Sequence, residues 1–417
     1  MYRILKWMRH LLPALLCFCL ALPAGDASAE EIVVFGSDGY DLLVYWDTLS
    51  DGRILLCGAQ AAPGGVDEAS ARLVCLNPDM TVSWEYVDPA CDGGKFARAQ
   101  ELADGTIGVV YCREHDTREE GWALRFFTPD GMPTGKEISI AEDASAVFYM
   151  VTSSRLFLEI RKTGSPIEYR LIDWDGNETE GLSSLQMRIR GMIDEPDGLV
   201  FAGDSLRNPP EIVPVILKTD LQCNVLMERP MYPVWADSED VEYLQVAKTA
   251  DGGYLCLQTE FRHPGEDGEG GERNALVKLD SRGTILWTGT AGLENVNQMC
   301  WMVVLDDGRM VLSYAPARED RLNVEMDFTQ VFIWFDENGQ NLGRTELDII
   351  PEYFRRLDQY RKTEPGKEEL VPLALTDTII QTQNGLWLTA IVCLAEPVTT
   401  IMDKDSFDAV LIRIPEP

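Results

Sequence analysis

Few side chains in this sequence have the type and spacing that catalysis requires. Beyond residue 29 the only histidines are His115 and His263, and both lie in polar stretches. An imidazole acts as a base only beside a nucleophile or carboxylate, and no local motif supplies one. The chain contains 69 acidic residues, which leave a glycosidase-like carboxylate pair open without specifying it. No glycine-rich phosphate loop, His-Glu-x-x-His or EF-hand spacing occurs. We therefore predict no catalytic residue, metal ligand or cofactor.

Aromatic and cationic side chains outside the apolar runs are better candidates for binding. Exposed rings stack on sugars or anchor peptides, and a guanidinium recognises carboxylates. An alternative interpretation is that the rings only cap the edges of structural units. The ligand-binding residues predicted on this basis are Tyr232, Trp235, Arg262, His263, Arg318, Tyr353 and Arg355.

The segment 265–272 is acidic and glycine-rich, which raises the question of calcium. Its carboxylates lack the alternating ligand spacing of a known calcium loop. We interpret it as a solvated hairpin tip and leave weak calcium binding as the alternative. Another segment, Glu352–Lys362, has apolar residues at helical spacing and predicts a short helix over the rim of the fold.

The elements that must position these residues are short strands in a repeating unit. Each unit of 40 to 65 residues has an Asp-Gly turn, an apolar run, a variable stretch, a second apolar run and an Asp-containing turn, and often a tryptophan. The clearest example starts at Asp251-Gly252 and ends at Trp287. Four-stranded blades repeated at this period are typical of a β-propeller, because one blade alone cannot bury both of its faces.

Seven such units are present, and the last lacks a fourth strand. The segment Ile32–Phe35 is an apolar strand with no blade of its own, so we predict that it pairs with Ala409–Ile414 and closes the ring. Six blades would require discarding the third and weakest unit. The prediction is an all-β fold, a seven-bladed propeller of four-stranded antiparallel blades, in one domain over residues 30–417. Short turns should gather on one face and long, function-bearing loops on the other.

The segment Leu276–Asp280, with Gly283 and Trp287 after it, resembles the repeats of secreted bacterial propellers related to the quinoprotein and WD-repeat groups. This resemblance implies the fold and no particular activity. Quinoprotein dehydrogenases need adjacent cysteines and a calcium ion, and this chain has no adjacent cysteines. Sialidase Asp boxes also have a different spacing from the Asp280, Gly283 and Trp287 seen here.

Residues 1–29 have the pattern of a signal peptide. A basic start precedes an apolar stretch and a small-residue site at Ala27–Ala29, which predicts cleavage after Ala29 and a secreted or extracytoplasmic protein. No later apolar run is long enough to span a membrane. Eight cysteines follow the leader. We interpret them as buried thiols, and Cys57 with Cys75 is the pair to test for a disulfide.

The net charge of the chain limits the classes of partner that it can bind. The net charge of −33 disfavours nucleic acids and anionic lipid surfaces. We predict an exported binding module whose ligand is a glycan, a peptide or another envelope protein. A glycan hydrolase or lyase using loop carboxylates is the alternative, and a purely architectural envelope protein is a third interpretation.

Overall fold

The structure is a computed structural model of the 417-residue chain. It describes residues 32–35, 40–61, 68–90, 93–115, 118–142, 146–152, 154–161, 168–179, 182–206, 213–236, 238, 240–262, 271–290, 292–293, 300–314, 328–349, 371–395 and 402–417. Strands dominate these ranges, and they contain no helix with the length and apolar character needed to cross a membrane. The predicted leader and the predicted helix at Glu352–Lys362 lie outside them.

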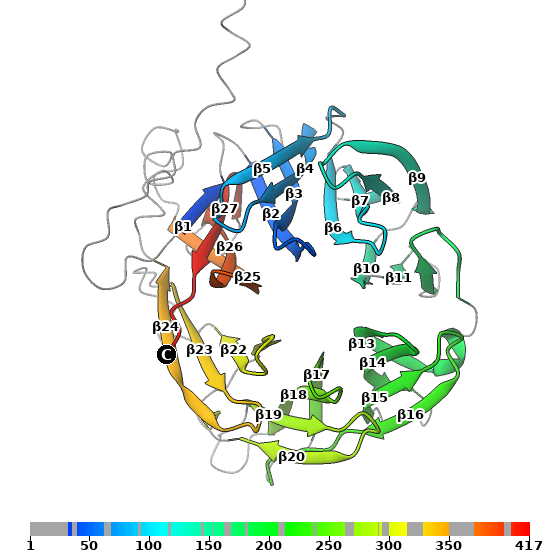
Figure 1. The fold of residues 1–417 in the computed structure, drawn as a ribbon, viewed down its shortest axis with the longest axis vertical. Coiled ribbons are helices and arrows are strands. Elements are labelled where there is room, and N and C mark those ends of the chain that lie inside the picture. The colour runs from blue at the N-terminus through cyan, green and yellow to red at the C-terminus, as the bar shows by residue number, and fades with distance from the viewer. Residues whose placement is uncertain are drawn as a thin grey trace, which may run out of the picture.

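The strands form seven separate sheets arranged around a central opening (Figure 1), as predicted. Blade one contains β2 (Tyr40–Thr48), β3 (Ile54–Ala61), β4 (Ser70–Leu76) and β5 (Val82–Val87). Blade two contains β6 (Gly94–Glu101), β7 (Ile107–His115), β8 (Arg118–Phe127) and β9 (Pro133–Glu142). Blade three contains β10 (Ala146–Val151), β11 (Arg155–Arg161) and β12 (Glu168–Asp173). Blade four contains β13 (Met187–Glu195), β14 (Gly198–Ser205), β15 (Val213–Thr219) and β16 (Val225–Pro230). Blade five contains β17 (Asp240–Lys248), β18 (Tyr254–Arg262), β19 (Gly271–Leu279) and β20 (Ile285–Gly289). Blade six contains β21 (Trp301–Val304), β22 (Met310–Tyr314), β23 (Phe328–Phe335) and β24 (Asn341–Ile349).

The seventh blade joins the two ends of the chain. It contains β25 (Val371–Thr382), β26 (Gly385–Ala395) and β27 (Met402–Arg413), and its outer strand is β1 (Ile32–Phe35). Ile32 pairs with Ile412 and Phe35 with Ala409 in antiparallel register. The predicted closure is confirmed. Because β1 covers the edge of β27, the ring is closed by strand pairing.

The third blade differs from the four-stranded expectation. Its described residues form three strands, and one isolated bridge between Ile172 and Glu178 marks the beginning of a fourth. A 3-10 helix, Leu182–Leu185, follows in place of an outer strand. Leu182 and Leu185 are buried in the core shared with blade four, so they supply apolar contacts at the base of the missing strand.

Aspartate side chains shape the turns that follow the third strand of several blades. In four blades an aspartate carboxylate accepts hydrogen bonds from the backbone N–H groups two and four residues later. These aspartates are Asp173, Asp220, Asp280 and Asp336. An aspartate that replaces backbone acceptors in this way favours a tight turn. The Asp-containing turns recognised in the sequence are therefore structural.

In the turn after the third strand, the residue three positions after the residue that opens the turn has positive φ, and in four blades it is glycine. At each of these glycines the preceding blade places a large side chain over the position, as Trp84 does at Gly131 and Trp287 does at Gly339. Ile138 covers Gly176, and Met227 covers Gly283, in the same way. In blades one and four the position is not glycine but the buried Met80 and Cys223, with φ of 65° and 61°.

Apolar clusters fill the spaces between adjacent blades, and the cysteines belong to this interior. The seven cysteines in the described residues are all buried free thiols. Cys57 pairs with Leu73 and Cys75 with Leu55, so the two thiols lie diagonally on neighbouring strands. The prediction of buried thiols is confirmed for these seven.

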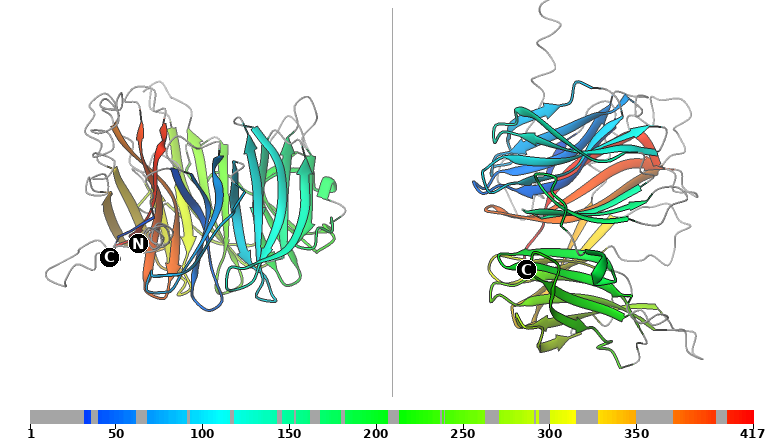
Figure 2. Two further views of the ribbon diagram at one scale, coloured as in Figure 1. Left: turned by 90° about the horizontal axis from the view of Figure 1, so that it is seen from above. Right: turned by 90° about the vertical axis from the view of Figure 1, so that its right-hand side faces the viewer.

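The short turns between the strands gather at one end of the blades (Figure 2), and the described connection 231–236 lies at the other end. The polar sequence of Arg113–Gly121 predicts one of the long loops, and this prediction is wrong. β7 extends to His115 and β8 begins at Arg118, because the two strands continue their pairing to His115 and Arg118. His115 therefore belongs to a strand.

Candidate functional site

Two of the predicted binding residues lie in the connection from the outer strand β16 to the inner strand β17. This connection, residues 231–239, crosses the end of blade five opposite the Asp251-Gly252 turn. Met231 is buried, whereas the Tyr232 side chain is 68% exposed. The connection therefore turns an aromatic ring outward immediately after an apolar anchor.

A buried carboxylate holds this connection in place. Glu260, near the end of β18, is fully buried and accepts hydrogen bonds from the backbone N–H groups of Val234 (2.7 Å) and Trp235 (3.1 Å). Gln258, also fully buried, donates from Nε2 to the Tyr232 carbonyl (3.2 Å) and to Glu260 (3.1 Å). Charge-assisted hydrogen bonds to a carboxylate are stronger than neutral ones. The backbone on both sides of Pro233 is thus fixed to blade five.

Trp235 is partly buried and contributes to the same anchorage. Its indole N–H donates to the Asn274 carbonyl on β19 at 2.9 Å. The Arg273 guanidinium lies 5.2 Å from the indole centroid, within the range of a cation–π contact. One part of the Trp235 ring system is therefore engaged within the protein, and Tyr232 is the more accessible of the two rings.

Arg262 ends β18 and pairs with Gly271, two residues beyond Glu260. The structure thus brings the backbone of Arg262 to the same end of blade five as Tyr232 and Trp235. The other four predicted residues, His263, Arg318, Tyr353 and Arg355, lie outside the described residues.

A further exposed ring on this face was not predicted from the sequence. Trp301 begins β21, the inner strand of blade six, at the end opposite the Asp307-Gly308 turn, and its side chain is 44% exposed. The side-chain amide of Gln245 on β17 forms hydrogen bonds to the backbone on both sides of Trp301. Nε2 donates to the Cys300 carbonyl (2.7 Å) and Oε1 accepts from the Met302 N–H (3.1 Å). A tryptophan opening an apolar run is typical of a core residue, so the pattern gave no signal of exposure.

Several buried carboxylates are engaged in ion pairs and hydrogen bonds within the protein, so they support catalysis less than the exposed rings support binding. Asp41, Asp88, Asp204 and Glu195 bind arginine or lysine side chains. Burial raises the pKa of Asp47 to about 6, and its neighbour Glu101 adds to this effect. Both groups are engaged between blades one and two, because Asp47 accepts from Gln100 Nε2 (2.8 Å) and Glu101 accepts from the Ser50 hydroxyl (3.0 Å). We interpret this pair as an inter-blade joint.

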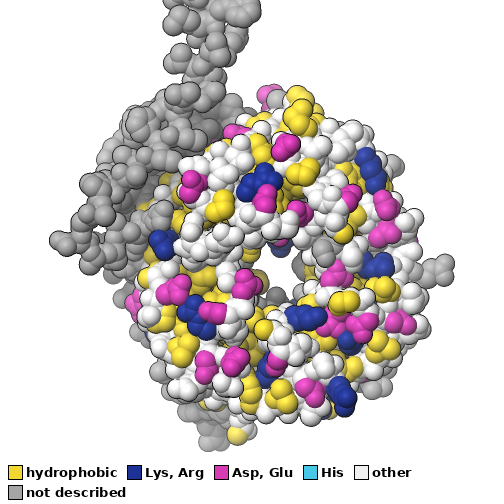
Figure 3. Space-filling view, viewed as in Figure 1, with side chains coloured by type: hydrophobic (Ala, Val, Ile, Leu, Met, Phe, Trp, Pro, Cys, Tyr) yellow, Lys and Arg dark blue, Asp and Glu magenta, His cyan; other side chains and the backbone are white. Residues whose placement is uncertain are grey.

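The described residues show no metal site, and the face in Figure 3 shows no single charged patch. Within the described ranges no three His, Cys, Asp or Glu side chains are placed to hold a metal ion. On the face shown in Figure 3, acidic and basic side chains are interspersed with apolar ones around the central hollow. The most distinctive feature of the described surface is therefore the pair of exposed aromatic rings on fixed backbone.

Comparison with known proteins assigns the chain to no family. No family model matches the chain, and no curated protein matches it. Among solved structures, the C-terminal WD40 domain of Sif2 has a TM-score of 0.45 at 10% identity, covering 94% of this chain and all of that domain. A post-proline cleaving enzyme from Rickettsia typhi has a TM-score of 0.46 at 10% identity, covering 88% of this chain and 50% of the enzyme, so the chain spans about half of that protein. The seven sheets around the central opening by themselves make the chain a seven-bladed propeller.

Proposed function

We propose that this chain is an exported, non-catalytic binding module. It recognises a polypeptide partner through the face of blades five and six that carries Tyr232 and Trp301. The observation that carries the proposal is the way two exposed rings are held. Glu260 and Gln258 fix the backbone beside Tyr232, and Gln245 fixes the backbone on both sides of Trp301. Both supports come from blade five.

Fixed aromatic rings suit this role for an energetic reason. Tyrosine and tryptophan bury a large area on binding and lose little side-chain entropy, so they are common energetic centres of interfaces. Backbone that is already ordered adds no further ordering cost when the partner binds. The strongly acidic chain favours a partner segment with basic residues.

The test is selection of binding peptides from a displayed random dodecapeptide library, followed by affinity measurements with two variants. We expect Tyr232→Ala and Trp301→Ala each to weaken binding about 30-fold, which corresponds to about 2 kcal/mol. Met132→Ala is the matched control, because Met132 is 64% exposed but lies in the turn after β8 at the opposite end of the blades.

Peptides that bind the Tyr232→Ala/Trp301→Ala double variant as tightly as the unmodified chain would show that this face is not the binding site. Selection of no peptide, together with binding of a soluble oligosaccharide lost in the same double variant, would replace the polypeptide partner by a glycan.

A further inference from the structure

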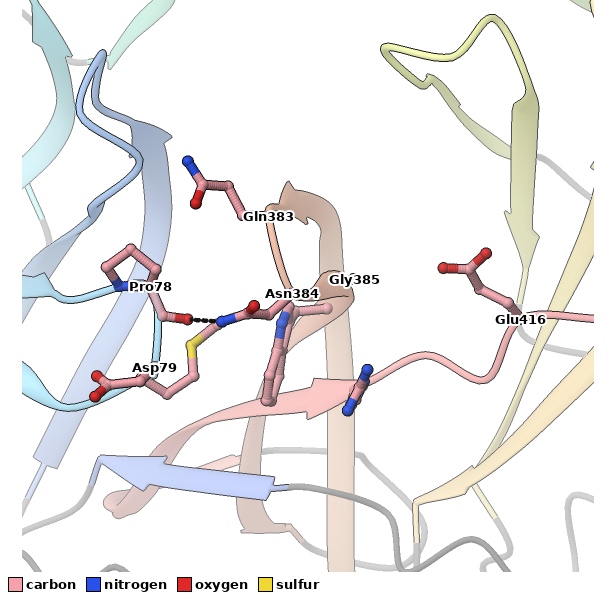
Figure 4. Close-up of a pocket in the computed structure, with 9 residues that line it drawn as sticks. Pro78, Asp79, Gln383, Asn384, Gly385 and Glu416 are labelled. Carbon is pink, nitrogen blue, oxygen red and sulfur yellow. Dashed lines mark hydrogen bonds between the residues drawn. The ribbon is translucent and has the colours of Figure 1, made fainter.

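A polar cavity lies on the opposite face from Tyr232, at the seam where the first and seventh blades meet. Its volume is about 570 Å³, within the roughly 300–1,000 Å³ typical of ligand pockets. One side is the turn Pro78–Met80 of blade one, and the facing side is the turn Gln383–Gly385 of blade seven. Figure 4 shows these two turns facing each other, with Glu416 across the opening from Gln383.

The Asn384 side chain joins the two turns, and other polar groups on the same turn can still bind a ligand. Asn384 donates from Nδ2 to the Pro78 carbonyl (2.6 Å), and this bond spans the seam. The Asn384 side-chain oxygen has no hydrogen bond within the described part of the chain. The Gln383 side-chain amide is exposed and forms no hydrogen bond with any described residue. Donors and acceptors for a ligand are thus present on the same turn.

Two carboxylates complete the polar lining, and each has one oxygen engaged. Asp79 Oδ1 accepts from the Thr81 N–H (3.1 Å) and hydroxyl (2.5 Å). Glu416 Oε2 accepts from Arg309 (3.0 Å). The second oxygen of each makes no hydrogen bond to the described residues. These carboxylates therefore keep acceptor capacity while part of their charge is already stabilised.

The charge balance of the lining disfavours a strongly charged ligand. Arg413 lines the same cavity as Asp79 and Glu416. An anion would approach two carboxylates, and an amine would approach the Arg413 guanidinium. A neutral molecule with many hydroxyl groups meets no such repulsion, because each hydroxyl both donates and accepts hydrogen bonds.

Carbon surface in the same cavity fits this class of ligand. Pro78 contributes to the wall and the largely buried Met80 and Trp387 lie beneath it, and a sugar ring has apolar C–H faces between its hydroxyl groups. We propose that the seam cavity binds a short neutral saccharide, held by Gln383, Asn384, Asp79 and Glu416. A bound saccharide bridges blades one and seven, so it stabilises the closed ring by RT ln(1 + L/Kd), where L is the concentration of free saccharide.

The experiment is titration of the purified full chain with maltose, cellobiose and N,N′-diacetylchitobiose up to about 10 mM, followed by calorimetry and amide hydrogen exchange. We expect one of the three to bind and to protect amides in residues 79–80 and 383–385. Gln383→Ala and Glu416→Gln should each weaken this binding about tenfold. Gln222→Ala removes an exposed amide from a turn on the same face and should change the affinity for the saccharide by less than twofold. Tyr232→Ala should also change this affinity by less than twofold.

Three results overturn the proposal. The first is that none of the saccharides binds. The second is that a saccharide binds equally well to Gln383→Ala and Glu416→Gln, or protects residues 231–236 instead. The third is that putrescine or citrate, used as cationic and anionic probes, binds the cavity in preference to all three saccharides.

Discussion

The indole of Trp287 on the outer strand of blade five lies over Gly339 in the turn of blade six, so that a methyl group on this glycine would meet the ring at 2.6 Å. Gly339 also has φ of +77°. Two separate requirements therefore select glycine here: the left-handed backbone and the closeness of the neighbouring blade. The glycine and the tryptophan form one inter-blade contact although they lie in different repeats.

Gly339→Ala should lower the free energy of unfolding by about 2–4 kcal/mol, because it combines backbone strain with overpacking. Gly252→Ala is the matched control. Gly252 has φ of +80°, but no atom lies within 4 Å of the position its methyl group would occupy. We expect that control to cost only about 1–2 kcal/mol. Urea unfolding of both variants measures the difference, and equal losses would show that Trp287 contributes nothing to the choice of glycine.

The ring of blades was predictable because its determinants are local. Asp-Gly turns and apolar runs recur at blade spacing, and an unassigned strand at Ile32–Phe35 matches the vacancy in the last blade. The third blade's missing outer strand was less visible, because it is replaced by a short helix whose leucines are buried against blade four.

The candidate site was predictable only in part. Tyr232 and Trp235 were identifiable as rings outside the strand pattern. Their support by Glu260 depends on how a connection folds over a strand that follows it, and no spacing in the sequence encodes that contact. The seam cavity brings together turns about 300 residues apart, near Pro78 and Asn384, so it exists only once the ring has closed.

The described thiols should resist alkylation in the native state. Burial raises the pKa values of the Cys57, Cys256 and Cys300 thiols to about 12, so almost no thiolate is present at pH 8. A short pulse of iodoacetamide followed by peptide mass spectrometry should leave these cysteines unmodified, and the same pulse in guanidinium should modify them. A Cys57–Cys75 disulfide peptide from the native protein would contradict this expectation.

Glu260→Ala should release the connection that carries Tyr232. The variant removes the acceptor of the Val234 and Trp235 N–H groups, so we expect a loss of about 3 kcal/mol in the free energy of unfolding. Hydrogen exchange of these two amides should accelerate far more than that of amides in blade two. An unchanged exchange rate at Val234 would show that another group holds the connection.

Asp47→Asn should change how stability depends on pH. The folded pKa of Asp47, about 6, lies above its ordinary value of 3.8 because of burial and the nearby Glu101. A group with a raised folded pKa contributes stability at low pH and loses it as pH rises through that pKa. The unmodified protein should therefore lose stability relative to the variant between about pH 4 and pH 7, by about 1–3 kcal/mol in total.

Asparagine keeps an oxygen that can accept from Gln100 and from the Glu101 N–H, so the substitution removes the charge while allowing the inter-blade hydrogen bonds to persist. Urea unfolding at one-unit pH steps measures the effect, because urea is uncharged. If the two stability curves run parallel from pH 4 to pH 8, Asp47 is not protonated in this range. If Asp47→Asn instead lowers stability at pH 8, the carboxylate itself stabilises the joint between blades one and two.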